Sequence, residues 1–212
     1  MAIPIIGPED ARLPAPRLML ASASPRRAQL LRQIGVAFEV QPAQLIERRG
    51  VAETIESCVS RLAQDKAREV YARLRGAGDS RTDALVLGAD TAVAIDGRML
   101  GKPCDESEAL TMLAQLSGRT HEVVSAVALI DARGMHCLLS RSRVRLRAIT
   151  VPEARRYWAS GEPADKAGAY AIQGFGAIFV QDLQGSYSGV MGLPLFETAQ
   201  LLDAAGMPRW RD

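Results

Sequence analysis

Hydrophobic and polar positions follow two different periods along this chain, and the two periods separate its helices from its strands. From Glu53 to about Leu74 the apolar residues recur at helical spacing, as on one face of an amphipathic helix. The segments 84–95, 122–130 and 136–149 are instead continuously apolar or alternate, which indicates strands. The pattern therefore predicts long strands and a long helix within the same chain.

Capping and turn residues place the shorter elements. A short strand at 18–21 runs into a helix that Ser24 caps, Pro25 opens and Gly35 ends. The remaining helices are expected at 105–117, at 151–160 and from Pro194 onward, and the remaining strands at 98–100 and 177–183. Because these elements do not repeat strictly as strand, helix, strand, the chain is predicted to be α/β with a mixed sheet.

Length, composition and net charge limit the size of the core, the classes of partner and the expected cellular compartment. A chain of 212 residues that is 48% hydrophobic can bury a sizeable core, and its net charge of only +2 gives no sign of a nucleic-acid or membrane partner. No apolar run approaches the roughly 20 residues of a membrane helix, and no basic segment opens a signal peptide. We expect a cytoplasmic protein with a flexible leader at 1–17 and a single domain at 18–212.

Cysteine and histidine spacing gives no support for a disulfide framework or a zinc site. The three cysteines are widely separated and form no Cys-x-x-Cys pair, and the two histidines are not at zinc-binding spacing. Two further motifs fail: the stretch from Gly97 to Lys102 departs from a Walker P-loop, and Tyr187 occupies the position that serine holds in a hydrolase nucleophile elbow. A Walker-type ATPase and a serine hydrolase are therefore not indicated.

Two arginines, Arg26 and Arg27, fall in the first turn of the helix that follows the first strand. The helix dipole disfavours positive charge at this position, while the free N–H groups of the first turn favour an anion such as phosphate. A phosphate bound there would account for both arginines. The alternative is that both side chains simply extend into water.

Other polar residues occupy positions where a ligand would explain them. Asp90 interrupts an apolar run, so its carboxylate is expected to be partly buried beside a cation, a metal or a proton; a structural aspartate is the alternative. Lys102 follows the hairpin and either returns beside Asp90 or extends from the turn into water. The stretch DKAGAYAIQG holds Lys166 and Gln173 among small residues that admit a ligand closely, although an ordinary surface loop has the same composition.

A stripe of arginines alternates along one predicted strand, at positions 141, 143, 145 and 147. The period of two puts all four side chains on one face of the strand. Binding of nucleic acid is one reading, but a solvated outer face over a buried apolar face is the better one.

Seven segments, in this order and spacing, resemble the Maf family of nucleoside triphosphate pyrophosphatases: LASASPRRAQLL, RLAQDK, VLGADTAV, GKP, LSGRTHEVVSAVAL, SGEPADKAGAYAIQG and VMGLPL. The resemblance runs from about Leu18 to Leu202. It implies an elongated mixed β-sheet with flanking helices and two lobes around a central cleft, similar in shape to inosine triphosphate pyrophosphatases. It also implies a homodimer that depends on Mg²⁺ or Mn²⁺.

The resemblance further implies a reaction and a substrate class. Maf enzymes cleave between the α and β phosphates, and SPRR, GADT and AYAIQG resemble the branch that acts on dTTP and UTP. Whether the cellular target is a normal or a modified pyrimidine nucleotide stays open. So does an alternative role as a nucleotide-sensing regulator without turnover, since the family is linked to septum formation and cell-division arrest.

Site residues are carried over from the family by position. The expected catalytic groups are Asp90, as proton acceptor, together with Glu47, Lys66 and Lys102. The expected substrate-binding residues are Ser22, Arg26, Arg27, Thr91, Lys166 and Gln173, of which Arg27, Thr91 and Gln173 discriminate the base. Glu47 and Asp90 are the expected metal ligands, although Ile46 stands where the family has a second acid, which weakens the assignment of Glu47.

Overall fold

A computed structural model of the chain describes residues 17–47, 50, 53–76 and 84–208. The predicted leader therefore lies, except for Arg17, outside the described residues. The strands are β1 (Leu18–Leu20), β2 (Phe38–Val40), β3 (Leu85–Ile95), β4 (Arg98–Leu100), β5 (Thr120–Asp131), β6 (Gly134–Leu146) and β7 (Val180–Gln184). The α-helices are α1 (Pro25–Gln33), α2 (Ile55–Gly76), α3 (Glu106–Leu116), α4 (Val151–Ala159), α5 (Tyr187–Met191) and α6 (Leu195–Ala204).

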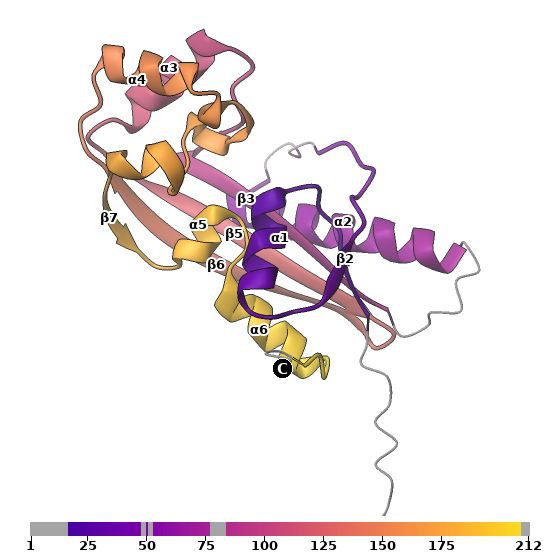
Figure 1. Cartoon of the computed structure of the whole chain (residues 1–212). Coiled ribbons are helices and arrows are strands. Elements are labelled where there is room, and N and C mark those ends of the chain that lie inside the picture. The colour runs from indigo at the N-terminus through magenta and orange to yellow at the C-terminus, as the bar shows by residue number, and fades with distance from the viewer. Residues whose placement is uncertain (1–16, 48–49, 51–52, 77–83, 209–212) are drawn as a thin grey trace, which may run out of the picture.

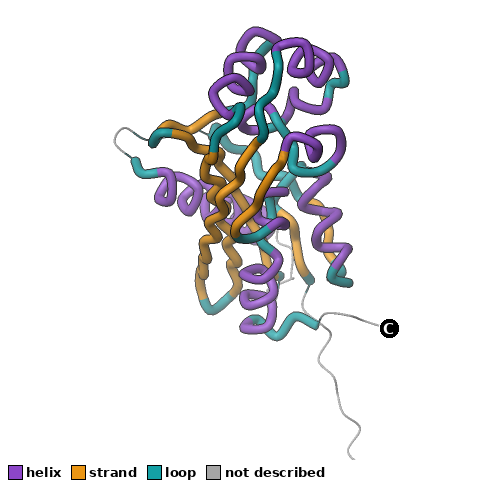
Figure 2. The backbone as a smooth tube through the Cα atoms, turned by 90° about the vertical axis from the view of Figure 1, so that its left-hand side faces the viewer, coloured by secondary structure: helices purple, strands orange, loops and turns teal. Residues whose placement is uncertain are grey.

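These strands form one mixed sheet in the order β2-β1-β3-β5-β6-β7, with β4 paired to β3. The pairs β1–β2 and β1–β3 are parallel, whereas the pairs β3–β5, β5–β6 and β6–β7 are antiparallel. Helices cover both faces of this sheet, as the turned view in Figure 2 shows. The predicted α/β class with a mixed sheet and flanking helices is thereby confirmed.

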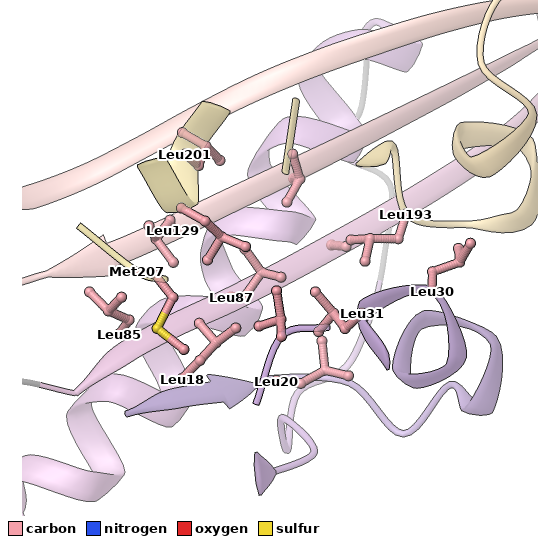
Figure 3. Packing of buried hydrophobic residues seen from close by; sticks show 14 of the residues in the cluster. Leu18, Leu20, Leu30, Leu31, Leu85, Leu87, Leu129, Leu193, Leu201 and Met207 are labelled. Carbon is pink, nitrogen blue, oxygen red and sulfur yellow. The ribbon is translucent and has the colours of Figure 1, made fainter. Parts of the chain in front are cut away.

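The alternation of side chains along β3 assigns each helix to a face. Val86 packs with the buried residues of α2, whereas Leu85 and Leu87, on the opposite face, pack with residues of α1 and α6. Figure 3 shows this second cluster, in which Leu30, Leu31 and Leu201 meet the leucines of the sheet. The two faces of β3 therefore pack against different helices.

A separate core fills the other end of the long strands. There α3 and α4 lie together (Figure 1), and their buried side chains pack with Val93 and Ile95 of β3. The cluster shown in Figure 3 instead takes the β3 residues Leu85, Leu87 and Ala89. Asp90 and Thr91 thus lie on β3 at the boundary between the two cores.

The edge of the sheet is interrupted at the same boundary. β1 pairs with β3 only over Leu85–Leu87, and β4 pairs with it only over Val93–Ile95. Residues 89–92 therefore have a strand neighbour, β5, on one side, while on the other side the chain of β1 has already turned away into α1. An interruption of this kind leaves room for a ligand beside the sheet.

Most predicted elements are present, with shifted ends. The helix expected from Glu53 begins at Ile55, and the strand expected at 177–183 is instead a 3-10 helix (Gly174–Phe179) followed by β7. Ser24 does precede α1 but its side chain makes no capping hydrogen bond, and its own N–H donates to Ser22 Oγ at 3.2 Å. The expected side-chain cap by Ser24 is therefore wrong.

The arginine stripe lies on the outside of β6, as the solvated reading predicted. Arg141, Arg143 and Arg145 are exposed and alternate with buried Ser142 and Val144. Acidic or amide side chains contact each of the four arginines, through Glu56, Glu122, Gln181 and Glu153. The stripe therefore has a structural explanation that needs no ligand.

Among the described helices, none combines the length and the apolar character that a membrane span requires.

Candidate active site

A cavity of about 320 Å³ opens where the edge of the sheet is interrupted. Its walls come from the β1–α1 turn, the loop after β2, α2, β3, the turn after β4 and α5. The polar and charged side chains among its lining residues are Ser22, Ser24, Arg26, Arg27, Glu47, Lys66, Asp90, Lys102 and Asp165. The structure thus brings together seven of the ten predicted site residues, from segments far apart in the sequence.

A buried lysine joins the two predicted carboxylates. Lys66 Nζ donates to Asp90 Oδ1 at 2.7 Å and lies 2.9 Å from Glu47 Oε1. Lys66 and Asp90 are only 6% and 7% exposed, whereas about half of the Glu47 side chain is exposed. Because charges are rarely buried without a partner, the ion pair explains how both groups sit in the wall of the cavity. The prediction that Asp90 is partly buried beside a cation is confirmed.

Helix α2 reaches Asp90 because β3 has a glycine two residues earlier. A Cβ on Gly88 would lie 2.1 Å from the carbonyl oxygen of Ala63 in α2, so only glycine permits this approach of the helix to the strand. Gly88 and Asp90 point to the same face of β3. The close packing therefore sets Lys66 against the carboxylate.

Burial and neighbouring charges act in opposite directions on Asp90. Burial raises the pKa of its carboxyl above the ordinary value, and the nearby cations Lys66 and Arg27 limit that rise. A carboxylate held in this way is a candidate proton acceptor and a candidate oxygen ligand for a cation.

Arg27 is anchored at the cavity and does not extend freely into water. Its Nε donates to the carbonyl oxygen of Gly192 at 2.8 Å, and its Nη1 donates to Ser22 Oγ at 3.1 Å. Arg26 also turns inward and pairs with Asp165 at 3.1 Å. Both arginines thus contribute positive charge beside the N-terminus of α1, the arrangement that binds phosphate.

The two remaining predicted lysines lie on other walls of the same region. Lys102 is exposed, and it lines the cavity that Asp90 lines, which agrees with the first of the two alternatives left open for it. Lys166 Nζ donates to the carbonyl oxygen of Glu162 at 3.0 Å and contacts the Asp165 carboxylate. With Lys102, four cations among the described residues line the cavity that Asp90 faces, the others being Arg26, Arg27 and Lys66, while Lys166 lies in the adjoining region.

A smaller pocket of about 70 Å³ adjoins this cavity and shares Arg26 and Met191 with it. The three predicted residues that the larger cavity lacks, Thr91, Lys166 and Gln173, all line this pocket. Apolar and aromatic groups make up most of its remaining wall. A pocket with few polar groups beside a cluster of cations suits a flat polar ring attached to phosphates.

Hydrogen bonds to the Glu162 carboxylate hold the loop that carries Gln173. Glu162 accepts hydrogen bonds from Tyr157 Oη at 2.7 Å and from the N–H groups of Phe175 and Gly176, each at 2.9 Å. Tyr157 Oη in turn accepts from the N–H of Ala171 at 3.0 Å. This partly buried network fixes both ends of the short segment that bears Gln173.

The donor set of the cavity fits a hard divalent cation. Asp90 and Glu47 converge on one side, and carboxylate oxygens are the ligands that Mg²⁺ and Mn²⁺ favour. Within the described part of the chain, no group of three histidine, cysteine or acidic side chains could hold a metal by itself. Two carboxylates fit the usual Mg²⁺ arrangement, in which substrate phosphates and water supply the remaining ligands.

Sequence reasoning missed two groups that hold the site together. Ser125 Oγ lies 2.8 Å from Thr91 Oγ1, and the carbonyl oxygen of Gly192 orients Arg27. A signal for Ser125 was present, since it is the one polar residue within the apolar run from Val123 to Ala128. For Gly192 no side-chain signal exists, because a backbone carbonyl carries the contact.

The chain is similar to known proteins over almost its whole length. A family profile described as Maf-like protein matches residues 17–205. A dTTP/UTP pyrophosphatase of Methylococcus capsulatus is 52% identical over 191 residues, covering 90% of this chain and 92% of that protein. A second dTTP/UTP pyrophosphatase, from Aromatoleum aromaticum, is 49% identical over 201 residues, covering 91% and 97%.

Among solved structures, the Ham1 protein of Staphylococcus aureus matches with a TM-score of 0.41 and 12% sequence identity, over 77% of this chain and 79% of that one.

Proposed function

Because this chain belongs to the Maf family, we propose that it is a nucleoside triphosphate pyrophosphatase that hydrolyses dTTP and UTP to the monophosphate and pyrophosphate. The observation that carries the proposal is the Asp90 carboxylate, which faces a cavity lined by Arg26, Arg27, Lys66 and Lys102. A general base beside a set of phosphate-binding cations is what hydrolysis of a phosphate anhydride requires.

In the proposed mechanism, Asp90 accepts a proton from a water that attacks the α-phosphorus. Lys66 keeps the Asp90 carboxylate oriented and resists its protonation. Arg26, Arg27 and Lys102 bind the phosphates and neutralise the charge that develops on the departing pyrophosphate. Arg27, expected from the family to discriminate the base, lines the cavity of Asp90 and not the pocket of Thr91 and Gln173, so we assign it to the phosphates. Positioning and charge neutralisation supply most of the catalysis in phosphoryl chemistry.

Mg²⁺ or Mn²⁺ would be held by Asp90 and Glu47 together with oxygens of the substrate. When bound, the cation supplies charge neutralisation at the phosphates and polarises the phosphorus that is attacked. The half-exposed Glu47 lies on a loop, so it is the weaker of the two protein ligands. Ile46, which stands where the family has a second acid, is exposed to solvent.

The smaller pocket is proposed to receive the pyrimidine ring. Thr91 and Gln173 offer a hydroxyl and an amide to the edge of the base. Arg26 lines both this pocket and the phosphate site, Lys166 lines the pocket, and Ser22 lines the phosphate site. The Gln173 amide both donates and accepts hydrogen bonds, and the Thr91 hydroxyl can accept one, so together they can distinguish bases by the donors and acceptors along their edges.

The proposal also includes a cytoplasmic homodimer built from a single domain at 18–212. The resemblance to the family supports the dimer, and native mass measurement of the purified protein tests it.

The substrate proposal is tested by release of pyrophosphate from a panel of dTTP, UTP, dUTP, CTP, GTP, 7-methyl-GTP and ATP, each with Mg²⁺, with Mn²⁺ and with a chelator. We expect cleavage led by dTTP and UTP, yielding monophosphate and pyrophosphate in equal amounts and abolished by the chelator. Tight binding of these nucleotides without cleavage would instead support the alternative function, a nucleotide-sensing regulator without turnover. Release of inorganic phosphate instead of pyrophosphate would contradict attack at the α-phosphorus.

A further inference from the structure

Three oxygen atoms form a hydrogen-bonded chain that leads from the smaller pocket into the protein. Thr91 Oγ1 lies 2.8 Å from Ser125 Oγ, and Ser125 Oγ donates to the carbonyl oxygen of Gly189 in α5 at 2.6 Å. Thr91 and Ser125 are direct cross-strand partners on β3 and β5, so their side chains point to the same face of the sheet. Ser125 is 1% exposed, whereas Thr91 reaches the wall of the pocket.

The direction in which each hydroxyl donates its proton follows from the last acceptor of this hydrogen-bonded series, the Gly189 carbonyl oxygen. A carbonyl oxygen only accepts, so the single hydroxyl proton of Ser125 is committed to Gly189. Ser125 Oγ can then only accept from Thr91, which commits the single proton of Thr91 as well. Toward the pocket, the Thr91 hydroxyl therefore presents lone pairs and no proton.

A hydroxyl that only accepts selects its partner on the base. Uracil and thymine carry an N–H at ring position 3, whereas the corresponding nitrogen of cytosine is an acceptor without a proton. An acceptor set against an acceptor leaves both atoms unpaired, and a binding site rejects such a ligand strongly.

We propose that Ser125 is a specificity-determining positioning residue, which favours pyrimidines with an imide N–H by holding the Thr91 hydroxyl as an acceptor. This inference rests on the proposed function, since it assumes that the pocket lined by Thr91 and Gln173 receives the base. Ser125 itself touches neither the substrate nor the reacting atoms. Its effect on the reaction passes through the proton of Thr91.

A second buried serine provides a matched control. Ser142, on the adjacent strand β6, is 4% exposed, and its Oγ donates to the carbonyl oxygen of Ser186 at 3.3 Å and accepts from the Ser186 N–H at 3.0 Å. Ser186 caps the same short helix α5 that contains Gly189. Ser142 thus supports α5 as Ser125 does, but it makes no contact with Thr91 among the described hydrogen bonds.

The test compares kcat/KM for UTP and CTP in wild type, Ser125→Ala and Ser142→Ala. Freed from Ser125, the Thr91 hydroxyl can rotate and donate to cytosine, so the ratio of UTP to CTP should fall about threefold to tenfold, the size of one hydrogen bond. Most of this fall should come from a gain with CTP. Ser142→Ala should keep the wild-type ratio even if it lowers both rates.

The inference is overturned if Ser125→Ala changes UTP and CTP by the same factor. If Ser125→Ala does not fold, Ser125→Cys, whose thiol is a weaker donor, is tested by the same ratio of kcat/KM for UTP to that for CTP. A wild type that releases no pyrophosphate from UTP would refute the proposed function instead. In that case the dissociation constants of UTP and CTP, measured by calorimetry in the same variants, test Ser125 by the same criterion.

Discussion

At the scale of single residues, Lys66 shows why the site needs buried charges to be paired. Its ammonium contacts both Asp90 and Glu47, so removal of the lysine would leave a carboxylate buried without its partner. The same reasoning made Asp90 visible in the sequence, because a lone carboxylate within an apolar run requires a partner. Sequence could not name Lys66 as that partner from spacing, since 24 positions separate the two residues.

His121 is a buried titratable side chain, and its burial changes the pKa of the imidazole ring. The side chain is 2% exposed and its Nε2 shares a hydrogen bond with Tyr170 Oη at 2.8 Å. Burial lowers the pKa of His121 from 6.5 to about 4, so the unfolded chain binds the proton at a higher pH than the folded protein does. Stability contributed by the neutral ring is therefore complete above pH 6.5 and is lost as pH falls toward 4.

We expect the free energy of unfolding to fall by about 1.4 kcal/mol for each pH unit in this window because of His121 alone. Urea unfolding at several pH values measures this slope. In His121→Gln the slope should be smaller than in wild type, whereas His136→Gln, which changes an exposed histidine, should keep it. Equal slopes in wild type and His121→Gln would contradict the assignment.

At the scale of elements, the sequence reveals long elements by their period, and it reveals short ones, such as the 3-residue strands β1 and β4, only where flanking turn or capping residues mark them. The 22 residues of α2 and the 11 residues of β3 show their periods clearly, and both elements were predicted. β2 and α5 have only 3 and 5 residues, too few to show a period, and both were missed. Their positions are set by tertiary contacts, such as the pairing of β2 with β1 and the hydrogen bond from Ser125 to α5.

The packing of α2 on β3 predicts the effect of one added methyl group. In Gly88→Ala the new Cβ would overlap the backbone of Ala63 and Ala67, so α2 must move away from β3 and carry Lys66 with it. We expect a loss of stability of about 1–3 kcal/mol, typical of overpacking, together with a clear loss of pyrophosphatase activity. Thermal unfolding and pyrophosphate release measure the two effects.

Gly76→Ala is the matched control, because it adds a methyl group at the end of the same helix where no atom lies within 4 Å. This variant should keep both stability and activity. Wild-type activity in Gly88→Ala would show that the distance between α2 and β3 does not govern the site.

At the scale of the whole molecule, the site lies at the junction of two cores. β3 belongs to the core of α1 and α6 at one end and to the core of α3 and α4 at the other, and Asp90 and Thr91 fall between them. The net charge of +2 concealed the local arrangement, because cations from distant segments gather only in the folded chain. The sequence predicted which residues matter, but their division between a phosphate cavity and a base pocket required the fold.

The central claim is that Asp90, at this junction, is the base that activates water. Asp96, in the turn that follows β3, offers a matched comparison: it is exposed, pairs with Arg119 and has φ of 51°, a conformation that asparagine adopts readily. Both Asp→Asn changes keep the shape of the side chain and remove its charge.

The most direct measurement is the rate of pyrophosphate release from saturating dTTP with Mg²⁺ in wild type, Asp90→Asn and Asp96→Asn, with folding verified by circular dichroism. We predict that Asp90→Asn is slower by about 10²- to 10⁴-fold, the usual contribution of a positioned base, while Asp96→Asn stays near the wild-type rate. A folded Asp90→Asn protein that releases pyrophosphate at the wild-type rate would contradict the account.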